Sequence, residues 1–102
     1  MLYLSGAAAP VLADEASDQY NYAVGLYKQQ RWNFSSEAFQ KFVEKWPQHE
    51  KIEAAELYLG LSLVKEQKYD AARAQLRPFA EKYPQSKYLP MRSINWQNAV
   101  TF

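Results

Sequence analysis

Residues 44–48 read Glu-Lys-Trp-Pro-Gln, and residues 81–85 read Glu-Lys-Tyr-Pro-Gln, 37 positions later. A period of roughly 20 to 50 residues is typical of arrays built from one repeated supersecondary unit. When residues 17–49 are placed over residues 54–86 without a gap, eight of the 33 pairs are identical. Other pairs keep their chemistry, as Trp32 and Tyr69 do. The chain therefore contains a duplicated unit.

The length and charge of the chain limit what it can be. Its 102 residues are enough for about one domain. The chain has 12 basic and 11 acidic residues, so its net charge is +1. The basic residues are spread along the chain, whereas binding to a phosphate backbone requires a cluster of them. The absence of cysteine excludes disulfides, thiolate nucleophiles and the usual zinc frameworks. We therefore expect no nucleic-acid partner and no cofactor.

The first 13 residues carry no charge and end in small residues before Asp14. This composition is typical of the end of a secretory signal peptide, and Val-Leu-Ala at residues 11–13 resembles a cleavage site. We expect residues 1–13 to be a truncated signal peptide, with a disordered apolar N-terminus as the alternative, and residues 14–102 to form the domain. Thirteen residues are too few to span a bilayer, so no transmembrane segment is predicted.

Apolar residues in both units recur with the spacing i, i+3, i+4, i+7, which places them on one face of a helix. They are Phe39, Phe42, Val43 and Trp46 in the first unit, and Leu76, Phe79, Ala80 and Tyr83 in the second. Each helix is expected to follow a polar cap, Asn33 or Asp70, and to stop at Pro47 or Pro84. The pattern predicts helices at 34–46 and 70–82.

The segments before these two helices are also predicted to be helical, at 16–30 and 50–66. Residues 52–64 are apolar on nearly every face, so this helix must lie between others. The helix at 16–30 is more polar, which suits a terminal helix with one neighbour fewer. A fifth helix is predicted at 88–100, either as a polar cap or as the start of a further unit. Neighbouring helices should be antiparallel, with no β-strand in 16–86.

Two features of the second unit bear on how its helices pack. Gly60 and Ala72 are expected to touch where the helices at 50–66 and 70–82 cross, because small residues let two backbones approach closely. Pro78 lies inside the helix at 70–82 and lacks the amide that would bond to the carbonyl of Ala74. We expect a kink near residues 74–77 that is tolerated on a solvent-facing surface, with a functional hinge as the alternative.

These features resemble the tetratricopeptide repeat, a helix pair with two small residues and one bulky residue at fixed positions and a proline near its end. The matching residues are Gly60, Ala72 and Leu76 in the second unit, about 53–86, and Ala23, Ser35 and Phe39 in the first, about 16–49. Gln19 and Glu56 stand where the motif prefers tryptophan. The resemblance implies an all-α fold, a right-handed α-solenoid of antiparallel helix pairs, with two repeats and a terminal helix at 88–101.

Residues 83–88 are similar to the spacer found in tetratricopeptide proteins of bacterial envelopes. Examples are the outer-membrane assembly lipoprotein and the periplasmic cell-division coordinator. Together with the signal-like start, this resemblance implies an exported protein of the periplasm or cell envelope. No cysteine follows the apolar start, so lipid attachment at such a residue is excluded.

No sequence motif supports catalysis. Glu50, Glu53 and Glu56 follow His49 and could form an acid–base or metal group, but their spacing is also that of a solvated helix edge. A lone histidine lacks the further ligands or the orienting partner that such a site needs. No phosphate-binding loop or nucleophile elbow occurs in the sequence. The sequence therefore does not predict an enzyme.

A binding surface is the remaining functional candidate. In tetratricopeptide proteins the first helix of each unit lines a concave groove, and the matching positions here are Tyr20, Val24, Tyr27, Lys28, Leu57, Leu61, Val64 and Lys65. An apolar groove with a basic rim suits an extended or helical peptide. The family's clamp for a C-terminal carboxylate uses lysine and asparagine, from which Tyr20, Val24 and Leu57 depart.

The resemblance therefore implies an adaptor that binds a peptide segment of a partner protein through this groove. The alternative is a structural element whose helix face is covered by a second copy, giving a homo-oligomer, or by the missing part of a larger array. A size measurement separates the two, because only the structural element requires an obligate assembly.

Overall fold

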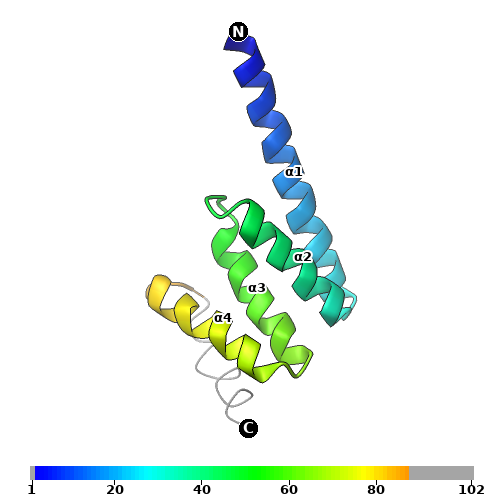
Figure 1. Ribbon diagram of the computed structural model, residues 1–102, viewed down its shortest axis with the longest axis vertical. Helices are drawn as coiled ribbons and strands as arrows, with labels where there is room; N and C mark the ends of the chain where they lie inside the picture. Colours follow the sequence, from blue (N-terminus) through cyan, green and yellow to red (C-terminus); the bar gives the residue numbers. More distant parts are fainter. Residues whose placement is uncertain (1, 88–102) are drawn as a thin grey trace.

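The structure is a computed structural model that describes the backbone of residues 2–87 and the side chains of residues 15–87. Within this part of the chain there are four helices and no β-strand: α1 Leu2–Lys28, α2 Trp32–Lys45, α3 Ile52–Lys65 and α4 Tyr69–Lys82. They pack in chain order as antiparallel pairs, and α1 also contacts α3 (Figure 1). The predicted all-α fold of antiparallel helix pairs is confirmed. The helix predicted at 88–100 lies outside the described residues.

The first helix is longer than the sequence predicted. We expected it to begin near residue 16, but α1 begins at Leu2, and its N-terminal part projects beyond α2 (Figure 1). Residues 2–13 are rich in alanine and leucine, which have the highest helix propensities, so the helix continues through them. No helix in 2–87 is long and apolar enough to cross a membrane. The assignment of residues 1–13 as a signal peptide stays a prediction.

The turn inside each helix pair has the same geometry in both units. Gln30 and Gln67 have φ angles of 63° and 65°, in the left-handed region. In each unit this residue and the next donate backbone hydrogen bonds to the last turn of the preceding helix. The bonds run from Gln30 to Tyr27 (2.9 Å) and Arg31 to Leu26 (3.0 Å), and from Gln67 to Val64 (2.9 Å) and Lys68 to Leu63 (2.9 Å). This is the Schellman motif, which ends a helix by satisfying its free carbonyls.

The prediction that Asn33 and Asp70 cap the second helices was wrong. The N-cap positions are Arg31 and Lys68, and neither makes a side-chain capping bond. The left-handed residue reverses the chain before the predicted cap is reached, so the second helix of each unit starts immediately after Arg31 or Lys68. Asn33 and Asp70 therefore lie in the first turn, where a negative charge such as that of Asp70 is favoured by the helix dipole.

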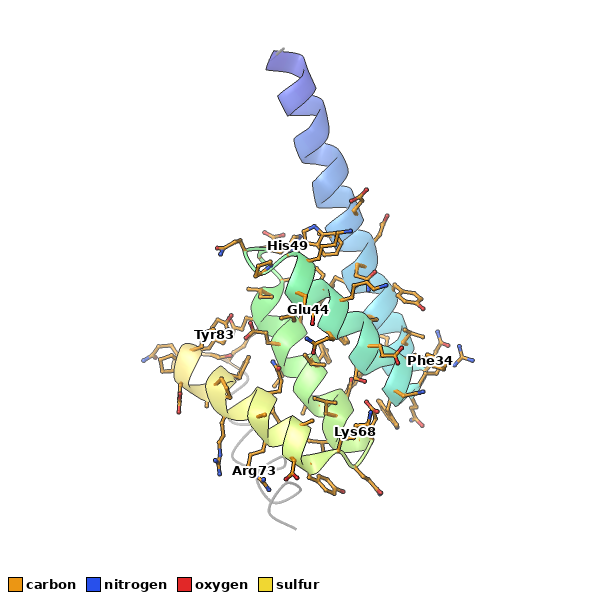
Figure 2. The ribbon with its side chains drawn as sticks, viewed as in Figure 1. Phe34, Glu44, His49, Lys68, Arg73 and Tyr83 are labelled. Atoms are coloured by element: carbon orange, nitrogen blue, oxygen red, sulfur yellow. The ribbon has the colours of Figure 1, made fainter. Side chains whose placement is uncertain are left out.

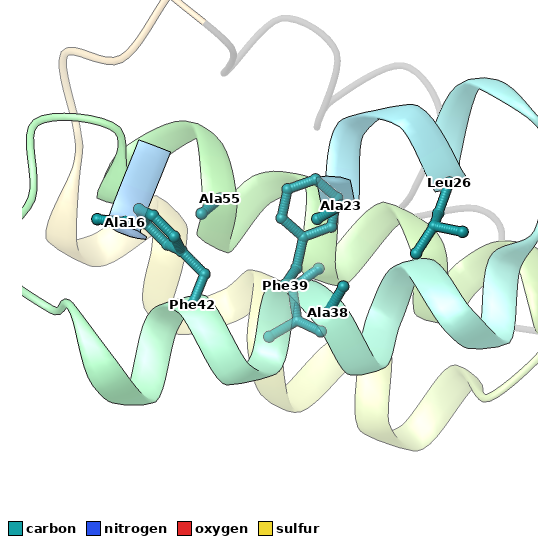
Figure 3. Close-up of a cluster of buried hydrophobic side chains, with 8 residues drawn as sticks. Ala16, Ala23, Leu26, Ala38, Phe39, Phe42 and Ala55 are labelled. Atoms are coloured by element: carbon teal, nitrogen blue, oxygen red, sulfur yellow. The ribbon is translucent and has the colours of Figure 1, made fainter. Parts of the chain in front are cut away.

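Two clusters of buried apolar side chains hold the helices together. The first joins α1, α2 and α3 and contains Ala16, Ala23, Leu26, Ala38, Phe39, Phe42, Ala55 and Leu59 (Figure 3). The second joins α3 and α4 and contains Leu57, Ala72, Leu76 and Phe79. The helix α3 contributes to both, as expected of a helix that is apolar on nearly every face. Phe39 and Phe42 are fully buried, and truncating such a side chain to alanine costs about 3 to 5 kcal/mol.

The predicted close approach of α3 and α4 occurs at Gly60, but its nearest neighbour is not Ala72. A Cβ atom added to Gly60 would lie 2.5 Å from Cγ of Leu76, and its three nearest neighbouring atoms all belong to Leu76. Helical side chains lean toward the helix N-terminus, so Leu76 reaches back over the level of Ala72. The nearest neighbour of Gly60 is therefore Leu76, and the contact between Gly60 and Ala72 stays a prediction.

Pro78 is exposed on α4, which runs without a break from Tyr69 to Lys82. Its position on the solvent side confirms that the proline is tolerated there.

Candidate peptide-binding surface

The eight predicted groove residues lie on α1 and α3, and their exposure differs. Lys28 and Lys65 are exposed, and Leu57 is only 2% exposed, so the structure places Leu57 inside the protein. The half-buried members are Tyr20, Val24, Tyr27, Leu61 and Val64. The α1 members pack against the first apolar cluster, whereas Leu57, Leu61 and Val64 belong to or pack against the second. The apolar members of the predicted groove on α1 and on α3 therefore pack against different clusters, and the groove itself stays a prediction.

Tyr27 belongs to an aromatic cluster at the C-terminal ends of α1 and α3. Its ring centroid lies 5.1 Å from that of Trp32 and 4.9 Å from that of Tyr58, both in edge-to-face geometry. Burial, and to a smaller extent the neighbouring Tyr58, raises the pKa of Tyr27. The ammonium of Lys65 lies 5.5 Å from the centre of the Trp32 ring. Tyr27 and Lys65 are thus brought together through Trp32, which the sequence did not single out as a site residue.

Tyr20 lies at the opposite end of the contact between α1 and α3. Its ring packs against Phe39 and Phe42 of α2, with centroid distances of 6.0 and 5.6 Å. The ammonium of Lys51 lies 5.8 Å from the centre of the Tyr20 ring. Tyr20 thus contributes one side of its ring to the protein core.

A hollow of about 630 Å³ opens beside Tyr20. Tyr20 is the only member of the predicted groove that lines it. The other walls come from the start of α3 and from the end of α4 with the turn that follows, and consist of Glu50, Lys51, Glu53, Ala54 and residues 82–87. The hollow therefore joins the first helix of each unit to the turn that closes the second unit. We call it the Tyr20 hollow.

Two carboxylates of α3 bind residues of one wall of the Tyr20 hollow, and of the two Glu53 itself lines the hollow. Glu56 accepts a hydrogen bond from Nζ of Lys82 at 2.8 Å, and this bond raises the pKa of Lys82. Glu53 accepts a hydrogen bond from the hydroxyl of Ser86. Burial first, and the nearby Glu56 second, raises the pKa of Tyr83. These bonds hold the turn after α4 against α3.

The expectation that Glu50, Glu53 and Glu56 form a solvated helix edge was wrong for Glu56, which is only 6% exposed. It occupies the position where the repeat motif prefers tryptophan, and there it is covered by α4 and paired with Lys82. His49 is a turn residue: its Nδ1 accepts a hydrogen bond from the amide of Lys51 at 3.0 Å. Among the described residues no group of three or more acidic or histidine side chains is placed to hold a metal ion.

The helix pair α3 and α4, with its Gly60–Leu76 contact, is also the part of the chain that is similar to a known protein family. Residues 54–86 match the family model of the tetratricopeptide repeat. These residues are a tetratricopeptide repeat. The sequence had predicted its bounds as about 53–86. Proteins with this repeat are usually non-catalytic scaffolds, and no catalytic domain was found. The repeat indicates a protein partner.

No curated protein and no solved structure matches the chain. A single repeat is found, at 54–86, and nothing in the match points to an envelope lipoprotein or a cell-division protein. The helix pair of α1 and α2 shares its turn geometry with the repeat, as the Schellman bonds at Gln30 and Gln67 show.

Proposed function

We propose that this protein is an exported adaptor that binds a peptide segment of a partner protein in the Tyr20 hollow. The tetratricopeptide repeat at 54–86 supports a protein partner. The observation that carries the proposal is the hollow itself, because its volume of about 630 Å³ is within the range of about 300 to 1,000 Å³ that is usual for ligand sites. Residues of the first helices of both units line it, and one of them, Tyr20, belongs to the groove that the family resemblance implies.

The lining of the Tyr20 hollow indicates the chemistry of the peptide. Tyr20 and Ala54 offer apolar surface, while Lys51 offers an ammonium beside it. Lys82, in contrast, is already paired with Glu56. We therefore propose a peptide with an apolar side chain that packs on Tyr20 and an acidic group that pairs with Lys51. Such a pair of contacts, one apolar and one charged, sets both affinity and register.

Peptide selection followed by matched charge reversals tests this proposal. A random peptide library is selected against the full chain, and the best peptides are measured on Lys51→Glu and on Lys45→Glu. Both lysines are exposed and both variants change the net charge equally, but Lys45 lies outside the Tyr20 hollow. We expect Lys51→Glu to weaken binding at least about tenfold and Lys45→Glu to leave it unchanged. Equal effects of the two variants, or the failure to select any peptide, would overturn the proposal.

Export is a separate part of the proposal and has a separate test. The uncharged composition of residues 1–13 supports it. We expect the protein in its native cell to be found in the envelope fraction, with a mature chain that begins at Asp14. Intact protein in the cytoplasmic fraction that still carries Met1 would contradict export and would leave the peptide proposal in place.

A further inference from the structure

The outer face of the α1–α2 pair carries two exposed aromatic side chains. Among residues 15–87, Tyr22 and Phe34 are the large hydrophobic residues that remain most open to solvent, at 60% and 48% exposed. Tyr22 comes from α1 and Phe34 from the first turn of α2. Figure 2 shows Phe34 at the edge of the molecule. Both line one small hollow of about 150 Å³, together with Ala38. Exposed aromatic side chains that gather in one place are typical of protein interfaces.

This hollow continues along the two helices. A second hollow, of about 440 Å³, shares Gln19 and Tyr22 with the first and extends to Trp46 at the end of α2. The amide of Gln19 donates a hydrogen bond to the carbonyl of Ala38 at 3.0 Å and so joins the two helices beneath the groove. We call the surface lined by these two hollows the outer face. On α1 the outer face and the Tyr20 hollow use different sides of the helix, because Tyr20 and Tyr22 are about 200° apart around its axis.

Charges of opposite sign lie along the two helices of the outer face. The acidic Glu37 of α2 lines the small hollow with Phe34. The other charged residues that line the two hollows differ in sign between the helices: Glu15 and Asp18 are acidic on α1, and Lys41 and Lys45 are basic on α2. All four side chains are exposed, and none forms an ion pair within the described part of the chain. Glu15, Asp18 and Lys45 line the same hollow, so the acidic and basic groups lie at the same level along the helices.

We propose that the outer face binds a second copy of this chain. A two-fold axis parallel to the helices would lay α1 of one copy over α2 of the other, at the same level. This arrangement sets Glu15 and Asp18 of each copy opposite Lys45 of its partner, twice in one interface, as a two-fold dimer requires. The charge pattern therefore supports a self-complementary dimer, with Tyr22 and Phe34 inside its interface.

Charge reversal tests the proposed dimer. An acid-to-base variant carries Glu15→Lys and Asp18→Lys, and a base-to-acid variant carries Lys41→Glu and Lys45→Glu. In each variant alone the side chains at positions 15, 18, 41 and 45 all carry one sign of charge, so we expect its dimer dissociation constant to rise at least about tenfold above that of the unchanged chain. In an equimolar mixture each basic face meets an acidic one, so the two variants should form a heterodimer. Sedimentation velocity at low ionic strength measures all of these species.

The control variant carries Lys51→Glu and Lys65→Glu. Both lysines are exposed and lie outside the outer face, and the net charge changes as much as in the base-to-acid variant. We expect the control to dimerise like the unchanged chain, and circular dichroism should show the same helix content in every variant. A monomeric unchanged chain at the highest soluble concentration, or a mixture of the two variants that stays monomeric, would overturn the proposal. Dimers that persist in both variants would place the interface elsewhere and overturn it as well.

Discussion

Gly60 of α3 packs directly against the side chain of Leu76 of α4, and no other residue type fits there without a shift. A Cβ atom at Gly60 would lie 2.5 Å from Cγ and 3.2 Å from Cδ1 of Leu76. Leu76 cannot move away easily, because it is only 1% exposed. In the first unit the equivalent positions hold Ala23 and Phe39, both fully buried in the first apolar cluster. The second unit thus uses glycine where the first uses alanine.

This contact predicts that Gly60→Ala destabilises the protein. Alanine in a helix is favoured over glycine by about 0.5 to 1 kcal/mol, but overpacking a filled core costs about 1 to 3 kcal/mol, so the steric term decides the sign. The matched control is Gly25→Ala on α1, because a Cβ atom there has no neighbour within 4 Å. Urea denaturation should give a lower midpoint for Gly60→Ala and a higher one for Gly25→Ala. An unchanged or raised midpoint for Gly60→Ala would mean that α3 and α4 can separate at this point.

The left-handed residues of the two turns predict a stabilising substitution. Gln30 and Gln67 have positive φ angles, which cost a non-glycine residue about 1 to 2 kcal/mol. We expect Gln67→Gly and Gln30→Gly each to raise the free energy of unfolding by roughly 0.5 to 1 kcal/mol, since part of the gain is offset by the flexibility of glycine in the unfolded chain.

The control for this prediction is Gln29→Gly. Gln29 does not have a positive φ angle, so glycine there brings only the entropic cost and should lower the stability. Thermal melts of the variants give the comparison. If Gln67→Gly and Gln29→Gly lower the melting temperature alike, the turn does not hold Gln67 in the left-handed conformation.

Leu61→Glu tests whether the α3 part of the predicted groove is open. Leu61 is half-buried against the second apolar cluster, so a carboxylate there can still reach water. We expect the helical signal in circular dichroism to survive, and any partner that binds across this face to be lost because it would meet an unpaired charge. The control is Leu59→Glu, two residues earlier, where the side chain is 2% exposed and a charge should unfold the protein. Loss of the helical signal in Leu61→Glu as well would place Leu61 in the core.

The raised pKa values of three side chains lead us to predict that the protein loses stability at alkaline pH. The pKa values of Tyr27 and Tyr83 are raised from 10.0, mainly by burial, and that of Lys82 is raised from 10.5 by its bond to Glu56. Each group therefore binds its proton more tightly in the folded than in the unfolded chain. Their stabilising effect is fully present below pH 10.0 and is lost as the pH rises through the higher folded values.

The measurement is the urea midpoint from pH 7 upward. It should begin to fall near pH 10, and the fall should be smaller in Tyr27→Phe, which cannot ionise at this position. A midpoint in Tyr27→Phe that falls as steeply as in the unchanged chain would show that the burial of Tyr27 does not contribute.

Helices α2, α3 and α4 and the second repeat could be predicted from the sequence alone. Apolar spacing is a property of neighbouring residues in one chain segment, and so the predicted ranges 34–46, 50–66 and 70–82 lie within two residues of α2, α3 and α4. The proline and the small residues at fixed positions identified the unit at about 53–86, which agrees with the repeat at 54–86. The start of α1 was missed because the signal-like composition of residues 1–13 was read as a separate segment.

The tertiary structure decided which side chains meet, because contacts between helices depend on the angle and depth of their packing and not on the spacing within either one. For this reason Leu76 is the nearest neighbour of Gly60, Leu57 is buried, and Glu56 pairs with Lys82. For the same reason the apolar members of the predicted groove on α1 and on α3 pack against different clusters. The wrong prediction of the caps at Asn33 and Asp70 has a related cause. The sequence shows that Gln30 and Gln67 are identical, but their left-handed conformation follows from the turn that the packed helices impose.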